Sequence, residues 1–221
     1  AEITSRDPYL RNRIVIVPHG SYTPFINIRE DKFGSREKLG LPHNKIILLF
    51  FGMIKEVKGL EVLLDSFAIT ITKNPNVVLL IAGKPWKNDF SVYQKIIDHH
   101  NLSNNIIQHT KFINDNDVKH YYCASDLVVL PYKKIYQSGV LMMSLSYKKP
   151  VLVSDLPPLT EIIIDNKNGF VFKSEDIQDL SQKLISILSD KEKLEKVRIN
   201  GAKSIGLKFD WNEIGRLTKN A

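Results

Sequence analysis

The sequence predicts an α/β protein with a doubly wound parallel sheet, helices on both faces and further helices at the C-terminus. Short apolar runs of strand length recur along the chain, and stretches with helical periodicity separate them. The runs are continuously apolar rather than alternating, which is typical of strands that are covered on both faces. Strands that alternate with helices favour right-handed crossover units, and therefore a parallel sheet.

The expected elements follow in chain order. The predicted strands are the apolar runs at 14–17, 46–51, 77–82, 106–109, 127–130 and 151–154. Three helices are indicated by apolar stripes at helical spacing: Leu60, Leu63, Leu64 and Phe67; Tyr93, Ile96 and Ile97; and Val140, Leu141, Met142 and Leu145. After Phe172 only helices are expected. Ser174 is the predicted N-cap of a helix whose apolar face carries Ile177, Leu180, Leu184 and Leu188, and another helix begins near Asp190.

The chain divides into two parts on composition. Residues 1–45 gather loop formers and charges after an isolated strand, which is typical of a connector segment. Residues 46–221 carry the regular alternation of elements and are expected to form one Rossmann-like domain with its C-terminal helices.

Composition narrows the classes of function. The 31 basic and 24 acidic residues give a net charge of +7 that is spread evenly, which favours a small anionic ligand over nucleic acid. The single cysteine excludes an internal disulfide, and the histidines lack the spacing of a metal site. No apolar run approaches the roughly 18 residues of a membrane span. We therefore expect a cytoplasmic location, with association with an anionic membrane surface as the alternative.

Candidate ligand-binding residues follow the predicted strands, because ligands of open parallel sheets bind beyond the carboxyl ends of the strands. Glycines there let the backbone approach a ligand, lysines supply positive charge, and a helix N-terminus offers unpaired N–H groups. Such a set suits a diphosphate. Its members are Gly52, Lys55, Lys58, Gly83, Lys84, Gln137, Ser138, Gly139 and Val140.

Each of these features also has an ordinary structural explanation. Gly52 and Gly83 could be turns at strand ends, Lys55 and Lys58 could be solvated loop charges, and residues 137–139 could be a polar helix start. The coincidence of three such loops at one sheet edge favours the phosphate interpretation. Signatures of a dinucleotide fingerprint, a P-loop or a nucleophile elbow are absent from the sequence.

Residues 14–205 resemble a known family in the order and spacing of their motifs. The matching pieces are FFGMIKEVKGLEVLLDSF, LLIAGKPW, KFINDNDVKHYYCASDLVVLPY, QSGVLMMSLSYKKPVLVSD and LTEIIIDNKNGFVF. Together they resemble the C-terminal, donor-binding half of the retaining family 4 glycosyltransferases, which have the two-domain GT-B architecture. The resemblance implies a nucleotide-diphosphate sugar as donor, bound by the 46–221 domain, with no metal and no other cofactor.

Site residues carry over from the family by position. The resemblance implies that Lys58 contacts the donor diphosphate and that Lys55 stands in for a family arginine, whose usual place is Met53. These two lysines are the expected catalytic residues. The remaining positions imply donor binding: Gly52 in the basic loop, Gly83, Lys84, Phe112 and Ile113 around the base and ribose, Gln137, Ser138, Gly139 and Val140 at the phosphates and sugar, and Glu161.

The sequence departs from the family in two respects. Ile135 and Met143 stand where many members have glutamates, and Pro157 and Pro158 replace glycines near Glu161. The length leaves no room for the N-terminal acceptor-binding domain, which we expect from a missing part of the protein or from another polypeptide. The leading hypothesis is a hexosyltransferase in polysaccharide or glycoconjugate synthesis. The alternative is a non-catalytic GT-B-like module that docks to a partner protein. A third hypothesis, a sugar-nucleotide epimerase, would need acids and histidines in the cleft, and the sequence places none there.

Overall fold

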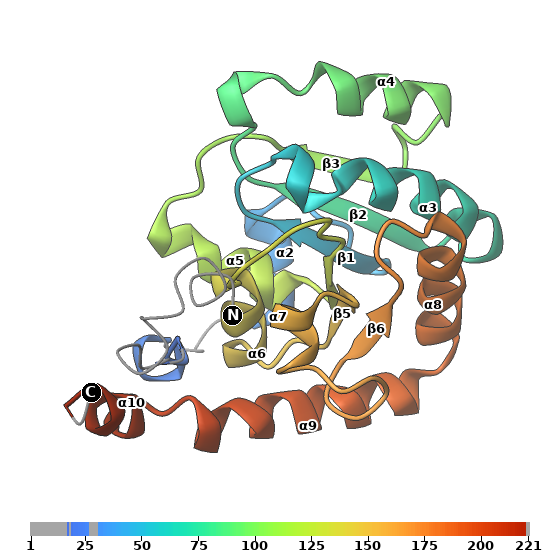
Figure 1. Cartoon of the computed structure of the whole chain (residues 1–221). Helices are drawn as coiled ribbons and strands as arrows, with labels where there is room; N and C mark the ends of the chain where they lie inside the picture. The colour runs from blue at the N-terminus through green and yellow to red at the C-terminus, as the bar shows by residue number, and fades with distance from the viewer. Residues whose placement is uncertain (1–16, 18, 27–30, 220–221) are drawn as a thin grey trace, which may run out of the picture.

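Six parallel strands form the sheet at the centre of the computed structural model, which describes residue 17 and residues 19–26 and 31–219 (Figure 1). The strand order is β3-β2-β1-β4-β5-β6, and every neighbouring pair is parallel. The strands are β1 (Ile46–Phe51), β2 (Val77–Ala82), β3 (Ile106–His109), β4 (Leu127–Leu130), β5 (Val151–Ser154) and β6 (Phe170–Phe172). The predicted doubly wound α/β fold is confirmed.

Helices cover both faces of this sheet (Figure 1). One face packs against α3 (Leu60–Lys73), α4 (Ser91–His99) and α8 (Ile177–Ser189). The other packs against α5 (Asp115–Ala124) and α6 (Gly139–Ser146), with α2 (Lys32–Lys38) against α5. The remaining elements are η2 (Thr23–Phe25), η3 (Glu56–Lys58), η4 (Trp86–Asn88), α7 (Pro157–Thr160), α9 (Lys191–Lys208) and α10 (Trp211–Lys219).

The strands are continuously apolar because successive side chains enter two different cores, one on each face of the sheet. In β1, Leu48 and Phe50 belong to the core on the α3 side, whereas Ile47 and Leu49 belong to the core on the α5 side. Successive side chains of a strand point to opposite faces, and here both faces are buried. Helix α9 contributes Val197 to the first core and Ile205 to the second.

The structure differs from the sequence-based expectations in several elements. Strand β6 was not expected, because its three residues are too short for a periodic signal. Ser174 is not the N-cap of α8: Asp176 takes that place, and its carboxylate accepts a hydrogen bond from the Asp179 amide at 3.0 Å. The Ser174 hydroxyl instead donates to the Tyr132 carbonyl. The strand expected at 14–17 lies outside the described residues except for Val17.

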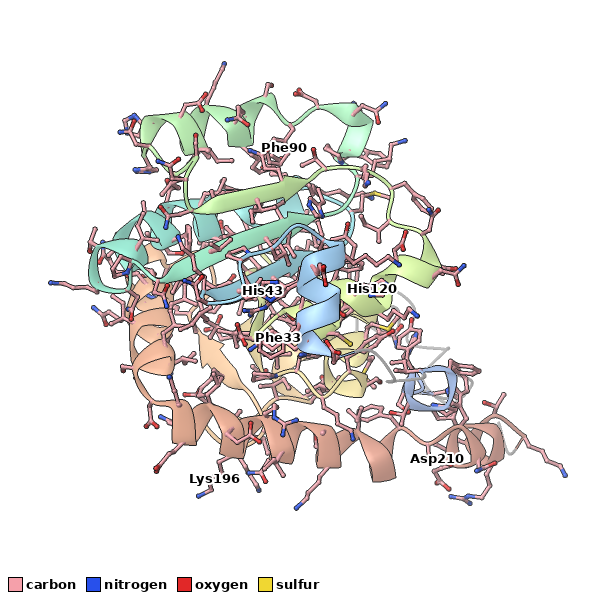
Figure 2. The ribbon with its side chains drawn as sticks, turned by 180° about the vertical axis from the view of Figure 1, so that it is seen from behind. Phe33, His43, Phe90, His120, Lys196 and Asp210 are labelled. Carbon is pink, nitrogen blue, oxygen red and sulfur yellow. The ribbon has the colours of Figure 1, made fainter. Side chains whose placement is uncertain are left out.

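Helix α2 lies in the segment that the sequence suggested as a connector, and a buried arginine fastens it to the sheet domain. Arg36 is 2% exposed. Its guanidinium donates to the carbonyls of Ala124, Pro42, His43 and Lys45 and to the Asp126 carboxylate. Figure 2 shows α2 on this face, with His43 and His120 near it. The domain boundary expected at residue 45 stays a prediction.

The last helix returns to the segment before α2. Ser21 donates its amide proton to the Phe209 carbonyl, and the Trp211 indole donates to the Ser21 carbonyl at 2.7 Å. Phe25 meets the Trp211 ring edge-on, so α10 lies beside η2 (Figure 1). Within the described residues, no helix combines the length and apolarity needed to cross a bilayer.

Replacing Arg36 should strongly destabilise the domain. Arg36→Ala removes the donor that several carbonyls share and the buried ionic partner of Asp126, which keeps only Lys32 and the Ile47 amide. Breaking a buried ion pair typically costs about 3 to 5 kcal/mol. The free energy of unfolding in urea measures this loss. Arg198→Ala is the matched control, because Arg198 is 35% exposed and pairs with Glu195 within one helix, where about 1 kcal/mol or less is expected. Equal losses for the two variants would contradict the anchoring role of Arg36.

Candidate functional site

The candidate site lies where the sheet changes winding direction. Strands β1 and β4 are neighbours, but α3 follows β1 on one face and α6 follows β4 on the other. In open α/β sheets, ligands bind in the crevice beyond the carboxyl ends of such strands. The loops at 52–59 and 131–138 meet there: the Lys133 amide donates to the Val57 carbonyl at 3.0 Å.

Two glycines permit this close approach of loops. Gly59 has φ 65°, and a Cβ added to it would lie 1.9 Å from the Pro131 carbonyl oxygen. Gly83 has φ 144°, and its added Cβ would lie 1.9 Å from the Gly52 carbonyl oxygen. Both separations are far below contact distance, and both φ values favour glycine. The three loops that the sequence singled out therefore pack directly against one another.

Lys58 lies on an aromatic ring in the loop that leads to α6. Its ammonium lies 3.7 Å from the centre of the Tyr132 ring, a cation–π contact. Tyr132 is 1% exposed. Burial raises the pKa of the Tyr132 phenol, and the Ser138 side chain is the neighbour that opposes this rise. Burial first, and then the charge of Lys55, lower the pKa of Lys58 to about 8.

The N-terminus of α6 has backbone donors to offer. Ser138 is its N-cap, and the Ser138 hydroxyl accepts a hydrogen bond from the Leu141 amide at 3.1 Å. The amides of Gly139 and Val140 precede the first intrahelical bonds, so they have no acceptor within the helix. A Cβ at Gly52 would lie 3.4 Å from the Val140 side chain, so the loop after β1 packs against this end of α6. We call Lys58, Tyr132 and residues 138–140 the phosphate site.

Lys55 takes a different direction from Lys58. Its ammonium lies 4.1 Å from the centre of the Trp86 ring, in the loop after β2. Both lysines belong to one short turn, because Lys55 precedes η3 and Lys58 ends it. The structure thus places Lys58 on Tyr132, whose phenol neighbours Ser138 at the start of α6, and places Lys55 on Trp86.

The remaining predicted residues have looser surroundings. Lys84 and Gln137 are exposed, Phe112 is 69% exposed and Ile113 is half-buried. Glu161 is also exposed and follows the short helix α7. The contacts of these five side chains with a donor stay predictions.

Sequence reasoning missed two tyrosines of the site. Tyr132 lies two residues after the end of β4, and its place after a predicted strand is a signal that could have identified it. Tyr22 had no such signal, because it lies far from the rest of the site in the sequence. Its amide donates to the hydroxyl of Ser146, 124 positions further along the chain, at 3.0 Å. The Tyr22 hydroxyl lies 3.3 Å from the Cβ position of Gly139.

Apolar side chains occupy the two positions where many members of the resembled family have glutamates. Ile135 and Met143 both pack, partly buried, against the core on the α5 side. Among the residues that the structure describes, no three histidine, cysteine, aspartate or glutamate side chains gather in a group that could hold a metal ion. Lys58 and the start of α6 offer electrostatic chemistry: a half-buried ammonium and helix N-terminal amides, both of which suit an anion.

Comparison with known proteins finds relatives in sequence and in fold. Spore coat protein SA of Bacillus subtilis (strain 168) is 25% identical over 228 residues, which cover 96% of this chain and 59% of that protein. The chain spans about half the length of the curated relatives it matches. The C-terminal domain of a group 1 glycosyl transferase from Francisella tularensis, LpcC, superposes with a TM-score of 0.75 at 22% identity. That likeness in fold covers 86% of this chain and 98% of the solved domain.

A second solved structure was determined with ligands. Anabaena HepE in complex with UDP and glucose superposes with a TM-score of 0.77 at 20% identity, over 88% of this chain and 52% of that one. The family model of the group 1 glycosyl transferases matches residues 31–204, the greater part of the sequence and all six strands. The chain belongs to the group 1 glycosyl transferase family.

Proposed function

We propose that the chain is the donor-binding domain of a hexosyltransferase that uses a nucleotide-diphosphate sugar. The observation that carries the proposal is the half-buried ammonium of Lys58, held on Tyr132 beside the N-terminus of α6 at the switch point of the sheet. HepE, with which the fold is shared, was solved with UDP and glucose. A relative that is 28% identical over 170 residues is a GDP-mannose:glycolipid mannosyltransferase of Xanthomonas campestris.

The proposed mechanism is stabilisation of the leaving group. As the bond from the sugar's anomeric carbon to the diphosphate breaks, negative charge builds on the departing phosphate oxygen. Lys58 and the amides of Gly139 and Val140 would face that charge in a partly dry site, where fixed dipoles act strongly. Lys55 would leave Trp86 to meet the second phosphate. This scheme assigns no role to a metal ion.

The acceptor is expected to bind elsewhere in the enzyme. We propose that an N-terminal acceptor-binding domain, from another part of the protein or another polypeptide, closes over the carboxyl edge of the sheet. The product would be a polysaccharide or a glycoconjugate, made in the cytoplasm. The second candidate is a docking module without turnover, which the apolar residues Ile135 and Met143 favour.

Lys58→Ala should weaken binding of UDP far more than binding of uridine. The variant removes the ammonium that would contact the diphosphate, and one charged contact is worth about 1.5 to 3 kcal/mol, or about 10- to 150-fold in affinity. Titration calorimetry with both ligands measures the two losses. Lys196→Ala, on the outer helix α9 (Figure 2), is the matched control and should change neither affinity.

The same titrations separate the two candidate functions. Equal losses for UDP and uridine would refute the role of Lys58 at the diphosphate. If the unmodified chain binds neither UDP nor GDP at millimolar concentration, the donor-binding proposal fails and the docking module becomes the better explanation.

UDP affinity should fall as the pH rises above about 8. Lys58 has a pKa of about 8 in the free chain, and a bound diphosphate would raise that pKa by favouring the charged amine. Binding is then strongest below pH 8 and loses up to about tenfold per pH unit above it, because proton uptake becomes part of binding. The phosphate itself stays fully ionised there, since its second pKa is about 6.

Calorimetry between about pH 7 and pH 9.5, in buffers of different ionisation enthalpy, measures the proton uptake. Lys58→Arg should flatten the profile, because a guanidinium stays charged throughout this range. A profile that is already flat in the unmodified chain would exclude Lys58 as the titrating group.

A further inference from the structure

A pocket of about 540 Å³ opens on the α3 and α4 side of the loops that carry the two lysines. Its walls include Ile54 and Lys55 after β1, Trp86 after β2 and Tyr93 in α4. Glu61 in the first turn of α3 and Lys133 after β4 are among the polar residues of the lining. We call this hollow the aromatic pocket. Its size falls within the range of small-molecule sites, about 300 to 1,000 Å³.

The aromatic pocket is separate from the phosphate site. A two-way backbone contact divides them: Ile54 donates to the Lys84 carbonyl at 3.0 Å, and Trp86 donates to the Ile54 carbonyl at 2.8 Å. Ile54 is 1% exposed and fills the wall. Lys58, Tyr132 and α6 do not contribute to the lining. Lys55 is the candidate donor-binding residue that faces the pocket.

One side of the pocket presents aromatic surface to solvent. Trp86 is 53% exposed even with the Lys55 ammonium over its ring, so the indole still has surface to offer a ligand. The loop that holds it is strained, because Lys87 and Asn88 both have left-handed backbone, at φ 57° and 59°. Strain of this kind persists where the surrounding structure imposes it, and it is common at binding sites.

A buried carboxylate supplies hydrogen-bonding capacity. Both carboxylate oxygens of Glu61 are buried, and Oε1 pairs with the Lys133 ammonium at 2.5 Å. Among the described residues, no hydrogen-bond donor reaches Oε2. Burial, and then Glu61, raise the pKa of the neighbouring Tyr93. A buried acceptor without a donor is costly, and the Glu61 side chain lines the pocket, so a turn of the carboxylate that brings Oε2 to a ligand hydroxyl would gain a hydrogen bond.

The charges of the lining select the class of ligand. Three lysines and three acids face the pocket, so it carries no net charge. These six residues are Lys55, Lys87, Lys133, Glu56, Glu61 and Asp89. A neutral balance does not favour a phosphate or another strongly charged group. Mixed donors and acceptors around an aromatic wall suit a neutral ring that has an apolar face and a rim of hydroxyls.

We propose that the aromatic pocket binds a neutral pyranose sugar, stacked on Trp86 with a hydroxyl donating to Glu61. This site lies outside the phosphate site, and its sugar does not take part in group transfer. The binding itself does not depend on the proposed donor-binding function. A sugar unit of a glycan would be held at the same rim of the sheet as the phosphate site.

The test follows the indole N–H signals of the full chain by nuclear magnetic resonance. The sequence has two tryptophans, so Trp86 and Trp211 give two signals, and Trp211→Phe assigns them. Glucose, mannose, galactose and maltose are the probes, and sorbitol, a polyol without a ring, is the control. We expect a saturable, millimolar shift of the Trp86 signal with at least one sugar, no saturable shift with sorbitol and none at Trp211.

Variants tie the signal to the pocket. Glu61→Gln keeps the size of the side chain but removes the charge, and it should weaken sugar binding by about tenfold. Trp86→Ala should abolish saturation transfer from protein to sugar, with circular dichroism confirming that the chain is folded. Sugar binding that is unchanged in both variants, or the absence of a saturable shift with all four sugars, would overturn the proposal.

A parallel titration with UDP separates this proposal from the donor-binding one. Binding of UDP without a response to sugars leaves the phosphate site in place and removes the sugar site. A response to sugars without binding of UDP supports the sugar site and removes the donor-binding proposal. Lys58→Ala should weaken UDP and leave the response to sugars unchanged, because Lys58 does not line the pocket.

Discussion

The close approach of three loops at the carboxyl edge of the sheet is the constraint on which the site depends. Only glycine allows the backbone at residue 59 to meet the Pro131 carbonyl, and the backbone at residue 83 to meet the Gly52 carbonyl. These contacts hold Lys58 within reach of Tyr132 and Trp86 within reach of Lys55. The glycines therefore act on function through geometry, whether or not they touch a ligand themselves.

One short turn separates two kinds of chemistry. Lys58, at the end of η3, reaches the phosphate site, where burial makes its charge costly and an anion would restore it. Lys55, before η3, lies on Trp86 at the aromatic pocket, where acids balance the lysines. Two lysines of similar sequence context thus have different electrostatic surroundings, because Lys58 lies on Tyr132 and Lys55 lies on Trp86.

Local information in the sequence was enough for strands β1 to β5 and for the loops that follow them, but not for the three-residue strand β6. Buried strands such as β1 and β2 can be recognised from their continuous apolar runs, and the ends of these runs locate the loops. The N-cap of α8 was misplaced because Ser174 and Asp176 are both good caps, and only tertiary contacts direct Ser174 to Tyr132. Tyr22 and Trp86 reach their partners across the fold, which residue spacing cannot reveal.

The apolar residues at the family's glutamate positions change what the rest of the site must supply. Ile135 and Met143 pack partly buried against the core, so they cannot accept hydrogen bonds from a sugar or ribose. The Tyr22 hydroxyl lies beside Gly139 at the start of α6, and the Tyr22 amide donates to the Ser146 hydroxyl at the end of that helix. Tyr22 stands between η2 and α6, and η2 packs on α10. Polar contact with a donor at this end of α6 would therefore depend on how the segment before the domain and the last helix pack together.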